Sequence, residues 1–217
     1  MLDTLVEMSD STPPLLVWLD AEMTGLNLDV DELVEVAVQI TDYELNRLDE
    51  GFHVVIKPSD EALTQMNDFV RQMHTDSGLI HDIPDGVSLA EAEDKLLEYL
   101  RTHLPEAGSA PLAGNTIGTD RAFLQRYMPR VNDHLHYRNI DVSTIKELSR
   151  HWFPKVYFQS PAKAGGHRAT ADILESIREL DYYRKSVMVE QPGPTTSESK
   201  KISESVTKSF GPIEHEA

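Results

Sequence analysis

The first third of the chain has the apolar patterning of β-strands. Residues 15–19 form a continuous apolar run, "LLVWL", which is typical of a buried strand. Apolar and polar positions alternate from Leu33 to Ile40, and residues 52–56 contain a third short apolar stretch. Polar connections such as "ELNRLDEG" separate these stretches and indicate hairpin-like turns. The pattern therefore predicts three consecutive strands.

After residue 87 the apolar residues recur at helical spacing. Ser88 is a candidate N-cap, Glu91 follows three residues later, and the segment 88–104 predicts a helix. Its apolar residues share one face: Leu89, Ala92, Leu96, Leu97 and Leu100. Ser143 is the candidate cap of a later helix. The remaining patterns predict strands at 110–115 and 137–142, and helices at 119–128, 143–153 and 169–187. This order predicts an α/β fold with helices flanking a mixed central sheet.

The length of 217 residues allows one sizeable core, and we expect a single domain over residues 15–189. Residues 1–14 are predicted to be a flexible leader. Residues 190–217 are rich in Pro, Gly, Ser, Thr and charge and poor in large apolar side chains, which predicts a disordered tail.

Cysteine is absent, which excludes disulfides and thiolate metal sites and fits a reducing cytoplasm. The chain has no run of about 18 apolar residues, and its start has no basic segment followed by an apolar one. We therefore expect a cytoplasmic protein without a membrane span, in which any metal binds through oxygen or imidazole.

The formal net charge of −17 argues against a broad surface for long nucleic acids, because non-specific binding to them requires the neutralisation of many phosphates. The charge is uneven, since seven basic residues and only three acidic ones lie between positions 130 and 168. The basic residues are Arg130, Arg138, Lys146, Arg150, Lys155, Lys163 and Arg168. A short anionic substrate remains compatible with this one basic segment.

Two carboxylates follow the apolar run of the first strand. Side chains two positions apart on a strand share a face, so Asp20 and Glu22 lie together at its carboxyl end. Adjacent carboxylates repel unless a proton or a cation lies between them, and hard oxygen ligands select Mg²⁺ or Mn²⁺. Taken alone, however, the pair is more typical of a solvated strand end.

Three further polar residues are candidates for the same chemistry. Asp120 lies in the first turn of a predicted helix, where an acid also simply complements the helix dipole. Asp172 lies beside the packing face of the last predicted helix, where an unpaired carboxylate would be costly. On a regular helix His167 and Asp172 would lie about 140° apart, so both reach one site only if His167 precedes the helix. Gly165 and Gly166 permit that approach, although His167 is also compatible with a surface loop.

In this order and at these separations, three motifs resemble those of the DEDD exonuclease superfamily in its histidine-containing branch, which has a ribonuclease H-like fold. They are "WLDAEMTGL", "GNTIGTDRAFL" and "HRATADILESI". The segments "MHTDSGLI", "HYRNIDVSTIKEL" and "HRATADILESIRELDYYR" are similar to the oligoribonuclease family, and the resemblance covers residues 15–186. It implies a 3′-to-5′ exoribonuclease that degrades very short 5′-phosphorylated RNA, especially dinucleotides, to nucleoside 5′-monophosphates.

The resemblance implies two divalent ions, Mg²⁺ or Mn²⁺, held by Asp20, Glu22, Asp120 and Asp172, with His167 as the general base. Elementary chemistry agrees with this assignment. Four converging carboxylates are tolerable only around cations, and a paired metal site can activate water and stabilise the leaving oxygen. A histidine titrates near neutrality and can accept the proton of the attacking water.

For the substrate, the resemblance implies that Leu26 and His74 wedge and stack against the terminal bases. It also implies a homodimer in which the partner protomer supplies Tyr137 and Arg138 to cap the 5′ phosphate. An arginine can bind a terminal phosphate bidentately. Four polar residues join this cap: Asn115, Thr116, Ser143 and Thr144. Thr116 stands where the family often has serine, and Phe69 stands where it often has tryptophan.

Three other interpretations remain open. A proofreading-type exonuclease acting on longer single-stranded DNA would share the five catalytic residues, but it should carry a basic track. An aspartyl-nucleophile phosphatase would need a shorter acid at position 22, where this chain has Glu22. A non-enzymatic metal-binding or interaction module would not require all five catalytic residue types.

Overall fold

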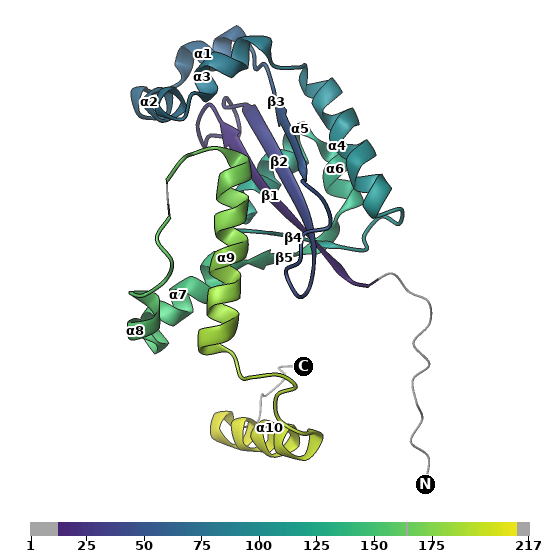
Figure 1. The fold of residues 1–217 in the computed structure, drawn as a ribbon, viewed down its shortest axis with the longest axis vertical. Helices are drawn as coiled ribbons and strands as arrows, with labels where there is room; N and C mark the ends of the chain where they lie inside the picture. Colours follow the sequence, from purple (N-terminus) through teal and green to yellow (C-terminus); the bar gives the residue numbers. More distant parts are fainter. Residues whose placement is uncertain (1–12, 164, 212–217) are drawn as a thin grey trace, which may run out of the picture.

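The computed structural model describes residues 13–163 and 165–211, and its centre is a five-stranded mixed sheet (Figure 1). The strand order is β3-β2-β1-β4-β5. The pairs β1–β2 and β2–β3 are antiparallel, whereas β1–β4 and β4–β5 are parallel. The strands are β1 (Leu15–Met23), β2 (Leu33–Asp42), β3 (Phe52–Val55), β4 (Pro111–Gly114) and β5 (His136–Asp141). The predicted strands and the mixed α/β architecture are confirmed.

Strand β1 lies in the middle of the sheet and is covered on both faces. Its odd-numbered residues, such as Val17, pack with α4, α5 and α6, whereas Leu16 and Trp18 pack against α7 and α9 (Figure 1). The helices of these two layers are α4 (Leu89–His103), α5 (Gly118–Tyr127), α6 (Pro129–His134), α7 (Val142–Trp152), α8 (Pro154–Tyr157) and α9 (Ala169–Val187). Burial on both faces explains why the sequence of β1 is apolar without alternation.

The starts of two helices test the predicted caps. Helix α4 begins where expected, and Ser88 Oγ accepts a hydrogen bond from the Glu91 amide at 3.3 Å. Helix α7 begins one residue before Ser143, and its N-cap is Asp141, whose Oδ1 accepts from the Ser143 amide at 2.9 Å. The predicted Ser143 cap was wrong because the last residue of β5 is a carboxylate that reaches this amide.

Four short helical segments connect β3 to α4 and lie at the end of the sheet where β1 finishes (Figure 1). They are α1 (Asp60–Gln65), α2 (Asp68–Asp76), α3 (Leu79–Asp82) and the 3₁₀ segment η1 (Ile83–Asp85). The sequence analysis predicted no element here, because segments of three to nine residues are too short to display a helical period. Helix α2 matters for the site because it carries His74.

The structure places a helix, α10 (Thr196–Phe210), in the tail that was expected to be disordered. Thr195 Oγ1 accepts from the Glu198 amide at 3.3 Å, and Glu198 Oε2 accepts from the Thr195 amide at 2.9 Å. This capping box opens the helix, and the expectation of disorder rested on composition alone. The apolar side chains of α10 remain exposed: Ile202, Val206 and Phe210.

No helix in residues 13–163 and 165–211 is long and apolar enough to cross a membrane. Residues 1–12 of the predicted leader, and the last six residues, lie outside the described residues. The division into leader, domain and tail and the cytoplasmic location stay predictions.

Candidate active site

Three carboxylates meet between β1 and the start of α9. Asp20 and Glu22 extend the side of β1 whose other residues pack against α9, and Asp172 lies in the first turn of that helix. One carboxylate oxygen from each residue lies within 4.8 Å of the other two, a spacing that a metal ion can bridge. The sheet and the helix therefore bring together residues that are about 150 positions apart.

Asp120 approaches these carboxylates from the other layer of helices. It lies in the first turn of α5, is buried, and its Oδ1 accepts a hydrogen bond from the Ala21 amide of β1 at 3.1 Å. It is outside the group of three, but its negative charge raises the pKa of Asp20. The structure thus brings three of the four expected ligands together and places the fourth beside them.

Burial and mutual repulsion raise the pKa of these carboxyl groups. Burial is the largest cause in each case, and it raises the pKa of Asp20 to about 9, that of Glu22 to about 8 and that of Asp120 to about 7. The pKa of Asp172 is also raised, first by burial and then by the charge of Glu175. Near neutral pH such groups need protons or cations close by.

The donor set fits divalent cations. All of its atoms are carboxylate oxygens, the ligands that hard divalent ions prefer. Among the described residues, no lysine or arginine nitrogen lies within 4.0 Å of these carboxylates. The cluster therefore has the charge and the geometry of a metal site.

His167 precedes α9, as the spacing in the sequence requires, and lies in an exposed loop. Its backbone φ of 44° is in the left-handed region, which is unusual for a residue with a side chain, and Gly165 has a φ of 68°. The charge of His167 acts to lower the pKa of Asp172, so the imidazole lies near the carboxylates. A turn with an unusual backbone conformation thus places the expected base directly before α9, the helix that carries Asp172.

Leu26 is held on the surface next to the end of β1, with 74% of its area exposed. The loop that presents it is closed by Asp31, which accepts hydrogen bonds from Thr24 Oγ1 at 3.0 Å and from the Asn27 amide at 2.8 Å. A Cβ atom on Gly25 would lie 2.4 Å from Asp31 Oδ2, so this turn requires glycine. Because the loop is fixed, the exposed leucine is available to a ligand.

His74 does not lie where a stacking residue should be. Its side chain is fully buried, and its Nε2 lies 2.8 Å from the Met23 carbonyl oxygen. Its Nδ1 lies 3.9 Å from Glu22 Oε2 and has no hydrogen-bond partner in the described part of the chain. In this position the ring is not accessible to a base for the expected stacking, because α2 directs it toward β1. The exposed aromatic residue of α2 is Phe69.

The polar residues expected around the 5′ phosphate fall into a cluster that follows β4 and β5. Ser143 Oγ donates to Asn115 Oδ1 at 3.1 Å, and the Thr116 amide donates to Ser143 Oγ at 3.0 Å. Thr116 has a φ of 53°, and its hydroxyl lies 3.1 Å from that of Ser143. Thr144 follows on the exposed side of α7.

Tyr137 and Arg138 lie together on the edge strand β5 but apart from this cluster. Arg138 Nε donates to the Tyr137 hydroxyl at 3.1 Å, and the guanidinium lies 5.5 Å from the centre of the Tyr137 ring. Both side chains are exposed, and no hydrogen bond of the described residues joins either of them to Asn115, Thr116 or Ser143. Within one chain, therefore, the expected phosphate cap is incomplete.

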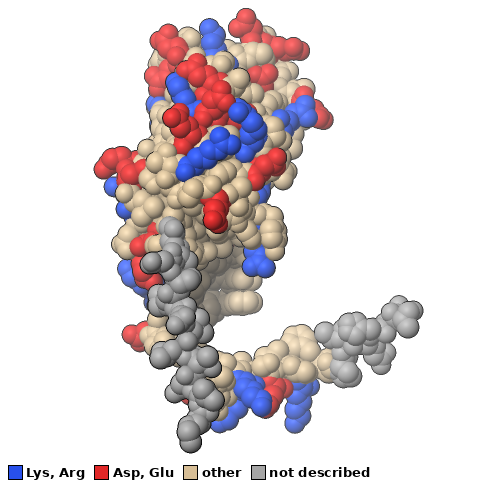
Figure 2. Space-filling model, turned by 90° about the vertical axis from the view of Figure 1, so that its right-hand side faces the viewer, with Lys and Arg blue, Asp and Glu red and all other residues tan. Residues whose placement is uncertain are grey.

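Most of the basic segment is neutralised by acidic partners. Lys146 and Lys163 pair with Glu179, whereas Arg130, Arg150 and Arg168 pair with other acids. Within the described ranges, Arg138 and Lys155 are the two members of the segment without a carboxylate within 4.0 Å. On the face in Figure 2, acidic and basic side chains are intermingled rather than separated into a basic track.

One buried charged residue beside the site was not predicted from the sequence. Glu35 lies on β2 directly opposite Glu22, and its side chain is fully buried. The signal was present, because a glutamate inside the apolar strand "LVEVAVQI" needs hydrogen-bond partners that its neighbours in sequence do not supply.

Comparisons with known proteins identify the family of the chain. Residues 17–180 match the family model of the RNase T type, which is described as exonuclease. The oligoribonuclease of Leifsonia xyli is 65% identical over 90% of this chain and 94% of its own length. The oligoribonuclease of Cutibacterium acnes is 55% identical over 87% of this chain and 93% of its own length. The structure of the E. coli exonuclease I complex with single-stranded DNA superimposes with a TM-score of 0.65 over 81% of this chain and 41% of that chain. At 12% identity it supports the fold alone.

The ribonuclease H-like fold and the acidic site thus define a metal-dependent exonuclease. The curated relatives of this chain define the class more closely, because oligoribonucleases are 50–65% identical to it over most of its length. The chain belongs to the oligoribonuclease family of 3′-to-5′ exoribonucleases. The phosphatase and the non-enzymatic module are excluded, and the DNA-directed alternative is less supported.

Proposed function

We propose that this exoribonuclease acts on very short 5′-phosphorylated RNA, with dinucleotides preferred, and releases nucleoside 5′-monophosphates. The observation that carries the proposal is that most basic residues of the segment 130–168 form ion pairs with carboxylates of the chain. Within the described ranges, Arg138 and Lys155 are the members of this segment without such a pair. Two free cations suffice for a few phosphates, whereas a long strand requires many. The names of the relatives point to the same class of substrate.

In this proposal, Asp20, Glu22, Asp120 and Asp172 hold two Mg²⁺ or Mn²⁺ ions. When bound, such ions supply charge for the attacking and leaving oxygens of an in-line displacement. His167 would accept the proton of the attacking water, since it lies in the loop directly before the helix that carries Asp172. Leu26 packs against the terminal base without reading its identity, because every base has an apolar face.

We infer that the 5′ phosphate is bound between two protomers. Asn115, Thr116, Ser143 and Thr144 would contact it in one protomer, and the partner would supply its own tyrosine and arginine from β5. The exposure of Tyr137 and Arg138 on an edge strand, away from the polar cluster of their own chain, supports this arrangement. A cap on the 5′ phosphate would fix the length of the substrate.

The proposed substrate is tested by a comparison of chain lengths. In Mg²⁺, a 5′-phosphorylated RNA dinucleotide should be cleaved with a kcat/KM at least about tenfold above that of a 30-nucleotide single-stranded DNA, because only the short substrate can occupy both the metal site and the cap. Quenched time courses with radiolabelled substrates measure both rates, and an RNA of equal length separates the effect of length from that of the sugar. Equal or faster cleavage of the long strand would contradict the proposal.

The shared cap is tested by complementation between an impaired variant and an inactive one. Arg138→Ala should lower kcat/KM for the dinucleotide by about 10- to 100-fold, because a charge-assisted contact to phosphate is lost. Asp20→Asn should be inactive because it lacks a metal ligand. After denaturation and refolding of an equal mixture, about a quarter of the wild-type activity should return, since half of the dimers are mixed and each holds one complete site. No recovery in mixtures shown by mass to contain mixed dimers would exclude a cap from the partner.

A further inference from the structure

Glu35 accepts hydrogen bonds from two distant parts of the chain, β3 and the start of α9. Its Oε1 accepts from His53 Nε2 at 2.7 Å and from Arg168 Nε at 2.9 Å, and it also forms an ion pair with Arg168 Nη2 at 2.9 Å. Its Oε2 accepts from the Ala169 amide at 2.9 Å. Burial alone would raise the pKa of Glu35, but these donors and the charge of Arg168 lower it, so the carboxylate is ionised. A fully buried anion is thus satisfied by its neighbours.

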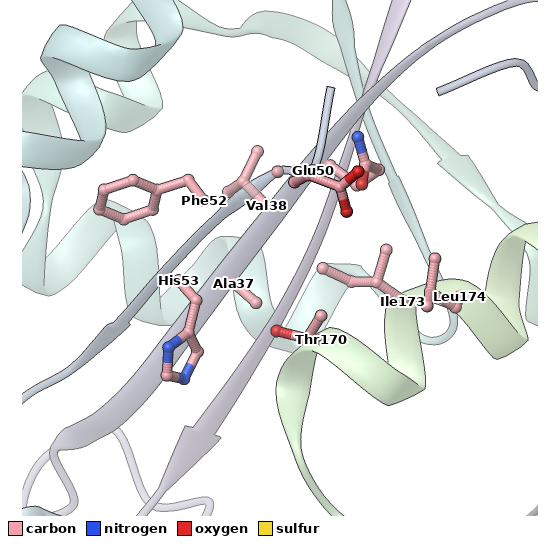
Figure 3. A pocket seen from close by; sticks show the side chains of 10 residues that line it. Ala37, Val38, Glu50, Phe52, His53, Thr170, Ile173 and Leu174 are labelled. Atoms are coloured by element: carbon pink, nitrogen blue, oxygen red, sulfur yellow. The ribbon is translucent and has the colours of Figure 1, made fainter. Parts of the chain in front are cut away.

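These contacts anchor the start of α9. The N-cap residue of this helix is Arg168, whose side chain makes no capping bond, so the open amide of Ala169 depends on Glu35. An anion at this position also complements the helix dipole. On the outer side His53 of β3 and Thr170 of α9 line a small pocket, and Figure 3 shows both side chains at its edge. Strands β2 and β3 therefore hold the first turn of the helix.

Arg168 extends the anchor to a third element. Its Nη1 donates to Asp82 Oδ2 of α3 at 2.9 Å while its Nε and Nη2 hold Glu35. The residue directly before it is His167, which lies in the exposed loop with its φ at 44°. An unfavourable backbone conformation persists only where the surroundings enforce it. Arg168 is the anchored residue next to that turn.

We propose that Arg168, clamped between Glu35 and Asp82, is a positioning residue that holds His167 against the metal-binding carboxylates. This inference rests on the proposed role of His167 as the base. Arg168 touches no reacting atom in this arrangement and acts through the backbone of its neighbour. A displacement of about 1 Å at a catalytic group can lower a rate by about 100-fold, so the clamp is expected to affect turnover rather than binding.

The chain offers a matched control for this clamp. Arg130 likewise joins a buried glutamate to an exposed aspartate, since its Nε donates to Glu93 Oε2 at 2.9 Å and its Nη2 to Asp94 Oδ1 at 2.6 Å. This second pair lies between α4 and α6, outside the active site. Arg130→Ala therefore removes the same kind of contact and should change kcat by less than about twofold.

Arg168→Ala should lower kcat by about 10- to 100-fold, with KM for the dinucleotide and Mn²⁺ affinity by calorimetry near their wild-type values. Arg168→Lys, which keeps the charge but cannot bond Glu35 and Asp82 at once, should be intermediate. In the background of His167→Ala, Arg168→Ala should have no further effect on the residual rate, because the group that it positions is gone. Should Arg168→Ala fold poorly, Asp82→Asn loosens the clamp from the exposed side and should give a smaller loss of kcat.

The outcomes separate this inference from the proposed function. If His167→Ala is slow but Arg168→Ala keeps the wild-type kcat, the clamp is refuted and the function stands. A further loss of rate in the double variant, or weakened Mn²⁺ binding in Arg168→Ala, would show that the arginine supports the carboxylates instead. If His167→Ala keeps the wild-type rate, the assignment of the base fails, and the inference fails with it.

Discussion

Asp20→Asn is expected to lower kcat by about 10³-fold or more while the protein remains folded. Asp20 is one of the three carboxylates whose oxygens lie within 4.8 Å of one another, and an amide is a weaker ligand without charge. Bound metal ions contribute several kcal/mol to the transition state of such a hydrolysis, and about 1.4 kcal/mol corresponds to each tenfold in rate. The rate is measured on a short RNA over a range of Mg²⁺ concentrations.

The same substitution should stabilise the protein when divalent ions are removed. Burial and the charges of Asp120 and Glu22 raise the pKa of Asp20 to about 9, so the folded protein retains a proton that the unfolded chain releases above about pH 4. This contribution to stability is fully present below about pH 4 and is lost as the pH rises through about 9. In EDTA, Asp20→Asn should therefore have a higher melting temperature than the wild type, and the difference should grow as the pH rises toward 9.

Divalent ions should reverse this order, because they stabilise the wild-type carboxylates more than the variant. Asp76→Asn is the matched control, since Asp76 is exposed and its side chain bonds, among the described residues, only Gln72 of its own helix, so activity and melting should stay as in the wild type. If Asp20→Asn melted below the wild type in EDTA at pH 9, the carboxylates could not be repelling one another in the metal-free protein.

The sequence was sufficient for the parts of the site that depend on local periodicity. Strand alternation places Asp20 and Glu22 on one side of β1 without any knowledge of the fold, and the structure has them on the side that faces α9. The position of His167 before the helix also follows from local geometry, and the residue does precede α9. Asp120 and Asp172 reach the same site because α5 and α9 pack against the sheet. Local patterns do not predict that packing, so the prediction for these two residues came from the resemblance to a family.

The features that the sequence did not predict depend on contacts between distant segments. His74 is buried because α2 packs its ring on Met23, 51 positions away, and nothing in "MHTDSGL" indicates that direction. The partners of Glu35 lie 18 and about 130 positions further along the chain. The capping box of α10 was local and could have been found, but the composition of the tail outweighed it.

His167→Ala should retain its fold and its metal affinity but lose turnover by about 10² to 10⁴-fold, the usual range for a general base. The side chain lies in an exposed loop, so its removal leaves no cavity in either core, and the three carboxylates of the metal group remain in place. The decisive measurement is the pH dependence of kcat/KM with a 5′-phosphorylated dinucleotide. A base must be neutral to accept a proton, so the wild-type rate should fall on the acidic side, and this decrease should be absent from the variant.

His151→Ala provides the control for the loss of a histidine, because His151 is exposed on α7 and, in the part of the chain that the structure describes, pairs only with Glu147 of its own helix. Its rate and its pH profile should match those of the wild type. Calorimetry with Mn²⁺ separates the two roles open to His167, since a base leaves the affinity unchanged whereas a metal ligand lowers it. A variant that keeps the wild-type rate at neutral pH would remove His167 from the chemistry.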